Sequence, residues 1–405
     1  MANFFERTGL PKALTWGYLG VLIFMMGDGI EQTWLSRYIT DAGFNAAELF
    51  SVYGITVGVS AWLSGVIAES WGVKRTMLAG FILYVLGVAG FASIGMANMN
   101  YPVLLATYAV KGLGYPLFAY TFMVWITYRV EKKVLSSAQG WFWFVFTGGL
   151  NVLGAYFGIY AKEHFGVIPT LWTAVLFAAV GAVFALWINK SGSNNLFAEK
   201  VSSGGFRELI RGLGIMKREP KVLMGGIVRV INTTSQFAFV VFMPLYMAQY
   251  GMTDGQWASI WGSIFVMNIL FNLIFGIVGD RFGWNRTVAW FGGVGCAVTV
   301  LLFYYSPQIL NQYWFILVCG ALWCIMLAGY VPLSALVPSL VENDKGAAVS
   351  VLNLGAGAAA FVGPALVRLL EKPIGYEGIA WTLSVLYIIS AVMTHYIRPK
   401  TAVEG

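Results

Sequence analysis

Charged residues are scarce in this sequence. Asp, Glu, Lys and Arg make up only 11% of its 405 residues, whereas 59% are hydrophobic. A chain of this composition has too little polar surface to coat a soluble globular protein, so we expect it in a lipid bilayer. The net charge of +7 is compatible with binding nucleic acid as well, so the placement of the basic residues must decide between the two.

Cysteine and histidine are also rare, with three and two residues. The cysteines lack C-x-x-C spacing and the histidines lack partners at metal-ligand spacing, so neither a disulfide framework nor a metal site is indicated. No Walker loop, G-x-S-x-G motif or H-E-x-x-H motif occurs. We therefore expect no ATP drive within the chain, no cofactor and no enzyme activity.

Long apolar runs are abundant instead. Counting about 20 apolar residues as one membrane crossing predicts twelve transmembrane helices in an all-α integral membrane protein. The predicted spans are 15–39, 47–70, 77–97, 102–128, 136–161, 168–189, 222–249, 256–279, 287–306, 312–338, 346–370 and 378–397. The longest polar interruption follows the sixth span. It predicts an N-terminal six-helix bundle at 1–189, a cytoplasmic linker with a short amphipathic helix at 190–221, and a C-terminal six-helix bundle at 222–405.

The placement of the basic residues predicts the orientation. With the N-terminus in the cytoplasm, 19 of the 25 Lys and Arg residues fall in cytoplasmic segments and 4 in external ones. Multi-pass membrane proteins follow this positive-inside rule. The bias accounts for the net charge without nucleic acid. It predicts a multi-pass protein of the cell (inner) membrane with both termini in the cytoplasm.

Segments after the second and eighth spans repeat each other. Gly65 to Arg75 aligns with Gly276 to Arg286, and upstream Gly43 to Gly54 aligns with Gly251 to Gly262. A spacing of roughly 210 residues indicates two halves of the same topology. Such halves are related by an axis along the membrane normal, and solute binds between them near the middle of the bilayer.

With this repeat, the whole chain resembles the major facilitator superfamily, whose signature after the second span is G-x-x-x-D-R-x-G-R-[RK]. The corresponding positions are Gly65, Glu69, Gly72, Lys74 and Arg75 in the first half, and Gly276, Asp280, Arg281, Gly283 and Arg286 in the second. The first copy departs from the signature at Glu69 and Ser70. The resemblance implies that these loops are gate latches. The alternative is that the glycines only permit a tight turn and the charges anchor at lipid headgroups.

Within the superfamily, two segments are similar to the polyol permeases, which carry pentitols. The segments are Phe4 to Lys12 and Met25 to Ser36. This resemblance implies a small polyol such as ribitol or D-arabinitol as the solute.

Two acids interrupt the first apolar run. Asp28 and Glu31 are three residues apart, hence on one helical face, and an ionised carboxylate in hydrocarbon is costly enough to indicate a functional site. Lys111 in the fourth span is predicted at a similar depth, which permits an ion pair. We interpret all three as substrate-binding residues and the two acids as proton-coupling residues, with either acid able to take the proton. The alternative is a structural ion pair that joins two helices.

Aromatic and amide side chains extend this predicted site. Trp34 is three residues from Glu31, Tyr115 is four from Lys111, and the repeat places Trp323 opposite Lys111. The predicted amides are Asn232, Gln236, Asn268, Asn272 and Asn353. Neutral donors and acceptors suit an uncharged, hydroxylated solute. The alternative is that the amides form interhelical hydrogen bonds and the aromatic rings only pack.

The leading prediction is a secondary active uptake transporter, a proton symporter for a small polyol that works by alternating access as a monomer. A second hypothesis keeps the fold but makes the solute a sugar acid or other organic anion, bound by Lys111 and by Arg229 in the seventh span. A third is a membrane receptor that binds a solute without transporting it. The predicted partners are the solute, protons and the lipid bilayer.

Overall fold

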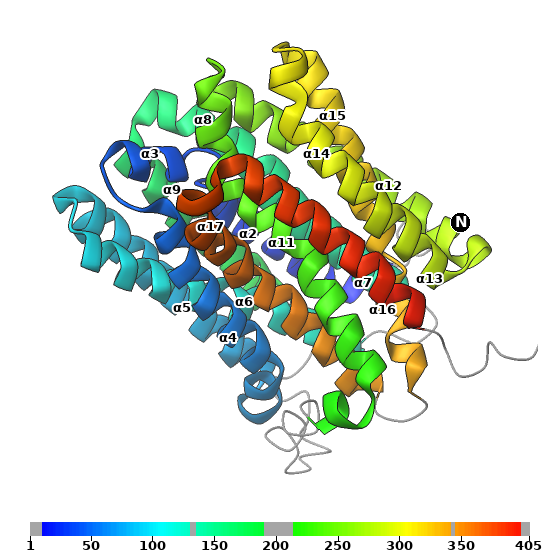
Figure 1. Ribbon diagram of the computed structural model, residues 1–405. Helices are drawn as coiled ribbons and strands as arrows, with labels where there is room; N and C mark the ends of the chain where they lie inside the picture. Colours follow the sequence, from blue (N-terminus) through cyan, green and yellow to red (C-terminus); the bar gives the residue numbers. More distant parts are fainter. Residues whose placement is uncertain (1–9, 130–134, 190–213, 342–344, 398–405) are drawn as a thin grey trace, which may run out of the picture. The chain divides into compact units, whose positions relative to one another are not determined.

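Helices make up all the regular structure in the residues that the computed structural model describes, which are 10–129, 135–189, 214–341 and 345–397 (Figure 1). Nine helical stretches in this part of the chain are long and apolar enough to cross a membrane. One of them, Val351–Tyr396, contains two spans, because Gly375 interrupts the helical geometry with a φ of 67°. The predicted amphipathic linker helix falls largely outside the described residues.

The helices follow the predicted spans closely. The first half contains η1 (Lys12–Leu14), α2 (Thr15–Gly29), α3 (Leu35–Asp41), α4 (Ala46–Trp71), α5 (Val73–Gly90), η2 (Phe91–Met96), α6 (Tyr101–Arg129), α7 (Leu135–Thr147), η3 (Gly148–Leu153), α8 (Gly154–Phe165), α9 (Val167–Ala182) and η4 (Val183–Ile188). The second half contains α11 (Pro220–Gln249), α12 (Asp254–Phe282), α13 (Trp284–Thr287), η5 (Val288–Gly295), α14 (Cys296–Ile309), α15 (Tyr313–Leu327), η6 (Ala328–Tyr330), α16 (Leu333–Leu336), η7 (Pro338–Leu340) and α17 (Lys345–Tyr396). Each of the twelve predicted spans coincides with one helix, with consecutive helices, or with one arm of α17, so the predicted all-α fold is confirmed.

The internal repeat is visible in the backbone. The glycines with positive φ in the described residues form pairs at a spacing of roughly 210 residues. The pairs are Gly43 with Gly251, Gly72 with Gly283, and Gly166 with Gly375. Side chains disfavour this left-handed region, so glycine is the residue that permits the same turn at equivalent points. The two halves therefore share turn geometry as well as sequence.

The first span is broken rather than continuous. Helix α2 ends at Gly29 and α3 begins at Leu35, and the residues between them form turns. Backbone hydrogen bonds between residues close in sequence span the break. The Gln32 amide donates to the Gly29 carbonyl at 3.3 Å, and the Leu35 amide donates to the Glu31 carbonyl at 2.9 Å. Broken membrane helices occur where backbone lines a protein interior or a cavity. The sequence analysis did not predict this break.

The chain forms two compact units. The first comprises Met1–Leu35 and Ile55–Phe206, and the second comprises Ser36–Gly54 and Arg207–Gly405. The boundary in the first span therefore falls directly after the break. Helix α3 and the start of α4 belong to the second unit although they lie early in the sequence.

Glycines bring α5 and α6 into close contact in the first unit. A side-chain carbon on Gly87 of α5 would collide with the backbone of Lys111 in α6. On the opposite helix, a carbon on Gly114 would lie 2.5 Å from the Cβ atom of Tyr84. Small residues permit such approach between membrane helices. The packing therefore holds Tyr84 and Lys111 against each other.

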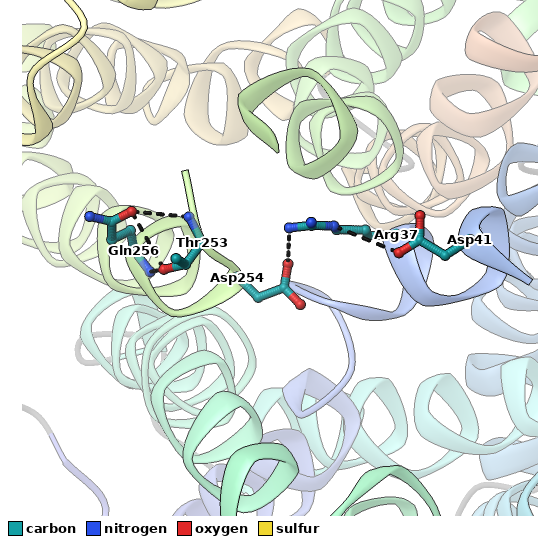
Figure 2. Close-up of polar contacts among 5 residues, drawn as sticks. All are labelled: Arg37, Asp41, Thr253, Asp254 and Gln256. Carbon is teal, nitrogen blue, oxygen red and sulfur yellow. Dashed lines mark hydrogen bonds and ion pairs between the residues drawn. The ribbon is translucent and has the colours of Figure 1, made fainter. Parts of the chain in front are cut away.

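Residues 36–54 dock onto helices of the second unit, in which α11 and α17 lie side by side (Figure 1). The Ser36 hydroxyl donates to the Val241 carbonyl of α11 at 2.8 Å. Arg37 pairs with Asp254 at 3.0 Å, from Nη1 to Oδ1, and with Asp41 at 3.8 Å, from Nε to Oδ2. Figure 2 shows the Arg37 guanidinium between these two acids. A capping box between Thr253 and Gln256 fixes the first turn of α12, which carries Asp254.

We expect the Arg37–Asp254 pair to add about 0.2–1 kcal/mol to the free energy of unfolding, because both side chains remain partly exposed, 35% and 18%. A double-mutant cycle with Arg37→Gln and Asp254→Asn measures this coupling in the purified protein. The cycle of Arg37→Gln with Asp41→Asn is the matched control, since Asp41 lies on the same helix as Arg37. If the coupling energy of Arg37 with Asp254 were no larger than that of Arg37 with Asp41, the Arg37–Asp254 pair would not hold residues 36–54 against α12.

Candidate functional site

Three charged side chains meet inside the first unit. Asp28 lies in the last turn of α2, Glu31 lies in the break that follows, and Lys111 lies near the middle of α6. Lys111 Nζ is 3.0 Å from Asp28 Oδ1, and it also forms an ion pair and hydrogen bond with Glu31 Oε1. All three residues are at most 3% exposed. The ion pair permitted by their similar depth is therefore present.

Two tyrosines complete the surroundings of the Lys111 ammonium. The centre of the Tyr108 ring lies 5.2 Å from Nζ, and the centre of the Tyr84 ring lies 5.5 Å from it. Both distances permit cation–π attraction. The Tyr108 hydroxyl also donates to Glu31 Oε1 at 2.7 Å. This side of the cluster is therefore aromatic, and one carboxylate oxygen of Glu31 accepts from two donors.

The sequence analysis did not select either tyrosine. Tyr108 lies three residues before Lys111, so the i,i+3 spacing on one helical face offered a signal for it. Tyr84 belongs to α5, and nothing in the local sequence links it to α6. Its position depends on the close helix packing at Gly87 and Gly114.

The charges of the cluster do not balance when every group is ionised. Two carboxylates then face one ammonium, which leaves one uncompensated negative charge in a site almost closed to solvent. Burying an unpaired charge is costly. The C-terminal end of α2 carries partial negative charge, which favours the ammonium and adds to the excess on the acids. Binding one proton would make the cluster neutral.

The predicted aromatic residues of the first unit lie in its core. Trp34 is fully buried, and its ring nitrogen donates to the Ile30 carbonyl at 2.8 Å, across the break. Lys162 Nζ lies 5.4 Å from the centre of the Trp34 ring. Tyr115 is 3% exposed and packs against Tyr120 and Phe146. The role of both residues in binding solute stays a prediction.

The predicted amides of the second unit are distributed over three helices. Asn268 donates from Nδ2 to the Cys324 carbonyl at 2.9 Å, and Asn272 donates to Asn268 Oδ1 at 3.4 Å. The first bond ties α12 to α15, as the packing alternative expects, and the second lies within α12. On α11, Asn232 is buried and Gln236 is half-buried, and Asn353 on α17 is also half-buried. Their role in binding stays a prediction.

An aromatic pair occupies the place in the second unit that corresponds to the ion pair in the first. At the repeat spacing of roughly 210 residues, Trp323 corresponds to Lys111 and Phe239 corresponds to Glu31. The ring centres of Phe239 and Trp323 are 4.8 Å apart, and Trp323 also stacks on Phe303 at 6.0 Å. The repeat therefore preserves the helix contact and replaces charge with aromatic surface.

The predicted gate loops share one turn. Gly72 and Gly283 both have a φ of 94° and precede α5 and α13. Lys74 Nζ lies 5.7 Å from the centre of the Trp125 ring. A side-chain carbon on Gly276 would meet nothing within 4 Å. Three cations near the turns are exposed: Arg75, Arg281 and Arg286. The surroundings of Gly65 and the side chains of Glu69 and Asp280 lie outside the described part, so the latch role stays a prediction.

The fold and the buried ion cluster define a multi-pass helical membrane protein built from a repeated half. The Major Facilitator Superfamily model matches residues 17–267 and 226–404. The chain belongs to this family, and the predicted resemblance is confirmed.

Known relatives extend over nearly the whole chain. It is 47% identical to the alpha-ketoglutarate permease of Bacillus subtilis (strain 168), over 98% of this chain and 91% of that protein. It is 37% identical to the ribitol transporter of Klebsiella pneumoniae, over 96% of this chain and 93% of that protein. Among solved structures, a D-xylose-proton symporter superimposes with a TM-score of 0.74 at 13% identity, covering 96% of this chain and 97% of that one. The chain is therefore a membrane transporter in type, and the solved structure shows the fold alone.

We expect Lys111→Met to lower the free energy of unfolding by about 3–5 kcal/mol, because it leaves two buried carboxylates without their cation. Chemical unfolding of the detergent-solubilised protein measures the loss. The matched control is the triple variant Lys111→Met, Asp28→Asn and Glu31→Gln, which removes all the charge and should be more stable than Lys111→Met alone. A Lys111→Met protein as stable as the wild type would contradict the ion-pair account.

Proposed function

We propose that the protein is a secondary active transporter that takes up a small polyol together with a proton. The observation that carries this proposal is the buried cluster of Lys111, Asp28 and Glu31, which holds one more acid than base. Its charge balances when one proton binds, so protonation and the state of the site are coupled by electrostatics. A site of this kind can load a proton from one side of the membrane and release it to the other.

Glu31 Oε1 accepts from both the Lys111 ammonium and the Tyr108 hydroxyl, which fixes the position of this carboxylate. We propose that one of the two acids, Asp28 or Glu31, carries the exchangeable proton. When one of them is protonated, the other forms a neutral pair with Lys111. When both are ionised, the excess negative charge favours taking up a proton again.

Several observations support a polyol as the solute. A carboxylate accepts hydrogen bonds from neutral hydroxyl groups, so the acids of the cluster suit a hydroxylated solute. The similarity to the ribitol transporter agrees with this choice. Ribitol and D-arabinitol are the solutes we propose. A neutral hydroxylated ligand is bound by hydrogen-bond donors and acceptors, and its site does not need a net charge.

The remaining expectations about the cycle belong to the same proposal. Alternating access would expose the solute site to one side of the membrane at a time, with the loops after the second and eighth spans acting as gate latches. We propose a monomer in the cell (inner) membrane with both termini in the cytoplasm, as the distribution of basic residues favours.

An organic anion is the second candidate solute. The relative at 47% identity is named an alpha-ketoglutarate permease, and α11 carries Arg229, a half-buried cation. A cluster that bound two protons would be positively charged and could accept a carboxylate. Against this candidate, Lys111 is already engaged with two acids.

A ligand screen distinguishes the candidates. The free energy of unfolding is expected to rise by about 2.7 kcal/mol when a solute is present at 100 times its dissociation constant. We expect ribitol or D-arabinitol to raise the melting temperature of the purified protein in a saturable way, with mannitol and succinate as size and charge controls. Stabilisation by alpha-ketoglutarate and not by polyols would select the organic anion. Stabilisation by a polyol without any flux in proteoliposomes would select the receptor hypothesis.

A further inference from the structure

The hydroxyl of Tyr84 is a buried polar group beside the ion cluster. Tyr84 lies in α5 and is 0% exposed. Its hydroxyl oxygen has no hydrogen-bond partner within the described residues. An unpaired buried hydroxyl costs about 1–3 kcal/mol, so a phenylalanine would serve better if packing were the only requirement. Stability alone therefore does not explain why position 84 carries a tyrosine.

The surroundings hold the Tyr84 ring in one place. Its backbone and Cβ atom press against Gly114 of α6, and the Phe24 ring of α2 packs on it with ring centres 4.9 Å apart. The Lys111 ammonium lies 5.5 Å from the ring centre. Three elements of the first unit thus orient one phenol beside the ion cluster.

Tyr108 provides the internal comparison. Both tyrosines flank the same ammonium at similar distances. The Tyr108 hydroxyl donates to Glu31 and so completes the protein's own network. The Tyr84 hydroxyl has no such partner among the described residues. The Tyr108 hydroxyl therefore serves the protein's own hydrogen-bond network, whereas the Tyr84 hydroxyl can donate to a bound solute.

We infer that the Tyr84 hydroxyl donates a hydrogen bond to a hydroxyl oxygen of the transported polyol, and that it is a specificity-determining residue of the solute site. This inference rests on the proposed function and names a contact within it. The hydrogen bond would connect the solute to α5. Helix α5 is in turn packed against α6, which carries Lys111, at Gly87 and Gly114. A site that donates to a solute oxygen rejects an analogue without that oxygen, since the donor is then left unpaired.

The substitution Tyr84→Phe tests this inference by deleting one oxygen. In the absence of solute, we expect the variant to unfold at the same temperature as the wild type or a higher one, because no protein bond is lost. We expect its dissociation constant for ribitol to rise about tenfold, measured by titrating ribitol in thermal-shift and transport assays. The wild type should bind the deoxy analogue of ribitol that lacks the contacted hydroxyl about tenfold more weakly than ribitol. Tyr84→Phe should bind this analogue and ribitol with similar dissociation constants, because the hydrogen bond is already missing.

Tyr108→Phe is the matched control, because it deletes the same atom from the other tyrosine beside Lys111. It breaks the bond to Glu31 and should lower the melting temperature without solute, which Tyr84→Phe should not do. Unchanged ribitol affinity in Tyr84→Phe would overturn the inference and leave the hydroxyl to an ordered water. A fall in solute-free stability equal to that of Tyr108→Phe would also overturn it, because the hydroxyl would then have a protein partner.

The failure of the proposed function gives a different result. In that case wild-type protein would show no stabilisation by ribitol or D-arabinitol, and the Tyr84 assignment would fall with it. If the wild type binds ribitol and Tyr84→Phe binds it equally well, only the Tyr84 contact is wrong and the transport proposal stands.

Discussion

The site depends on one electrostatic constraint, the burial of the Lys111 ammonium between two carboxylates. An isolated charge in this apolar setting would be costly, and each of the three groups is tolerable only because the others are present. The pairing joins α6 to the end of α2 and to the break in the first span. The same three groups hold one excess negative charge when all are ionised, which is the basis of the proton coupling proposed above.

Other features of the first unit bring the three charged groups together. Glycines at Gly87 and Gly114 let α5 and α6 approach until Tyr84 and Lys111 touch, and the break after Gly29 lets Glu31 leave the regular helix beside Asp28. The second unit repeats the helix arrangement with different chemistry, since Trp323 and Phe239 pack where the first unit has its charges.

The sequence predicted the parts that are anomalous within an apolar chain. Asp28, Glu31 and Lys111 stood out because charge in a long apolar run is expensive, and their similar depth correctly predicted the ion pair. The twelve spans and the repeat followed from run length and from glycines at matching turns. Tyr84 could not be predicted, because its place beside Lys111 results from packing between two helices. The break at residues 30–34 and the docking of Ser36 on α11 depend likewise on tertiary contacts, which leave no mark in local composition.

The central claim is that a proton bound by one acid of the buried cluster, Asp28 or Glu31, couples uptake to the membrane gradient. The most direct measurement compares two activities of Asp28→Asn and of Glu31→Gln in proteoliposomes: exchange of labelled ribitol across the membrane, and its accumulation against a concentration gradient under an imposed proton gradient. The account predicts that the wild type performs both, and that at least one of the two variants retains exchange and loses accumulation. Accumulation by both variants equal to that of the wild type would contradict the account.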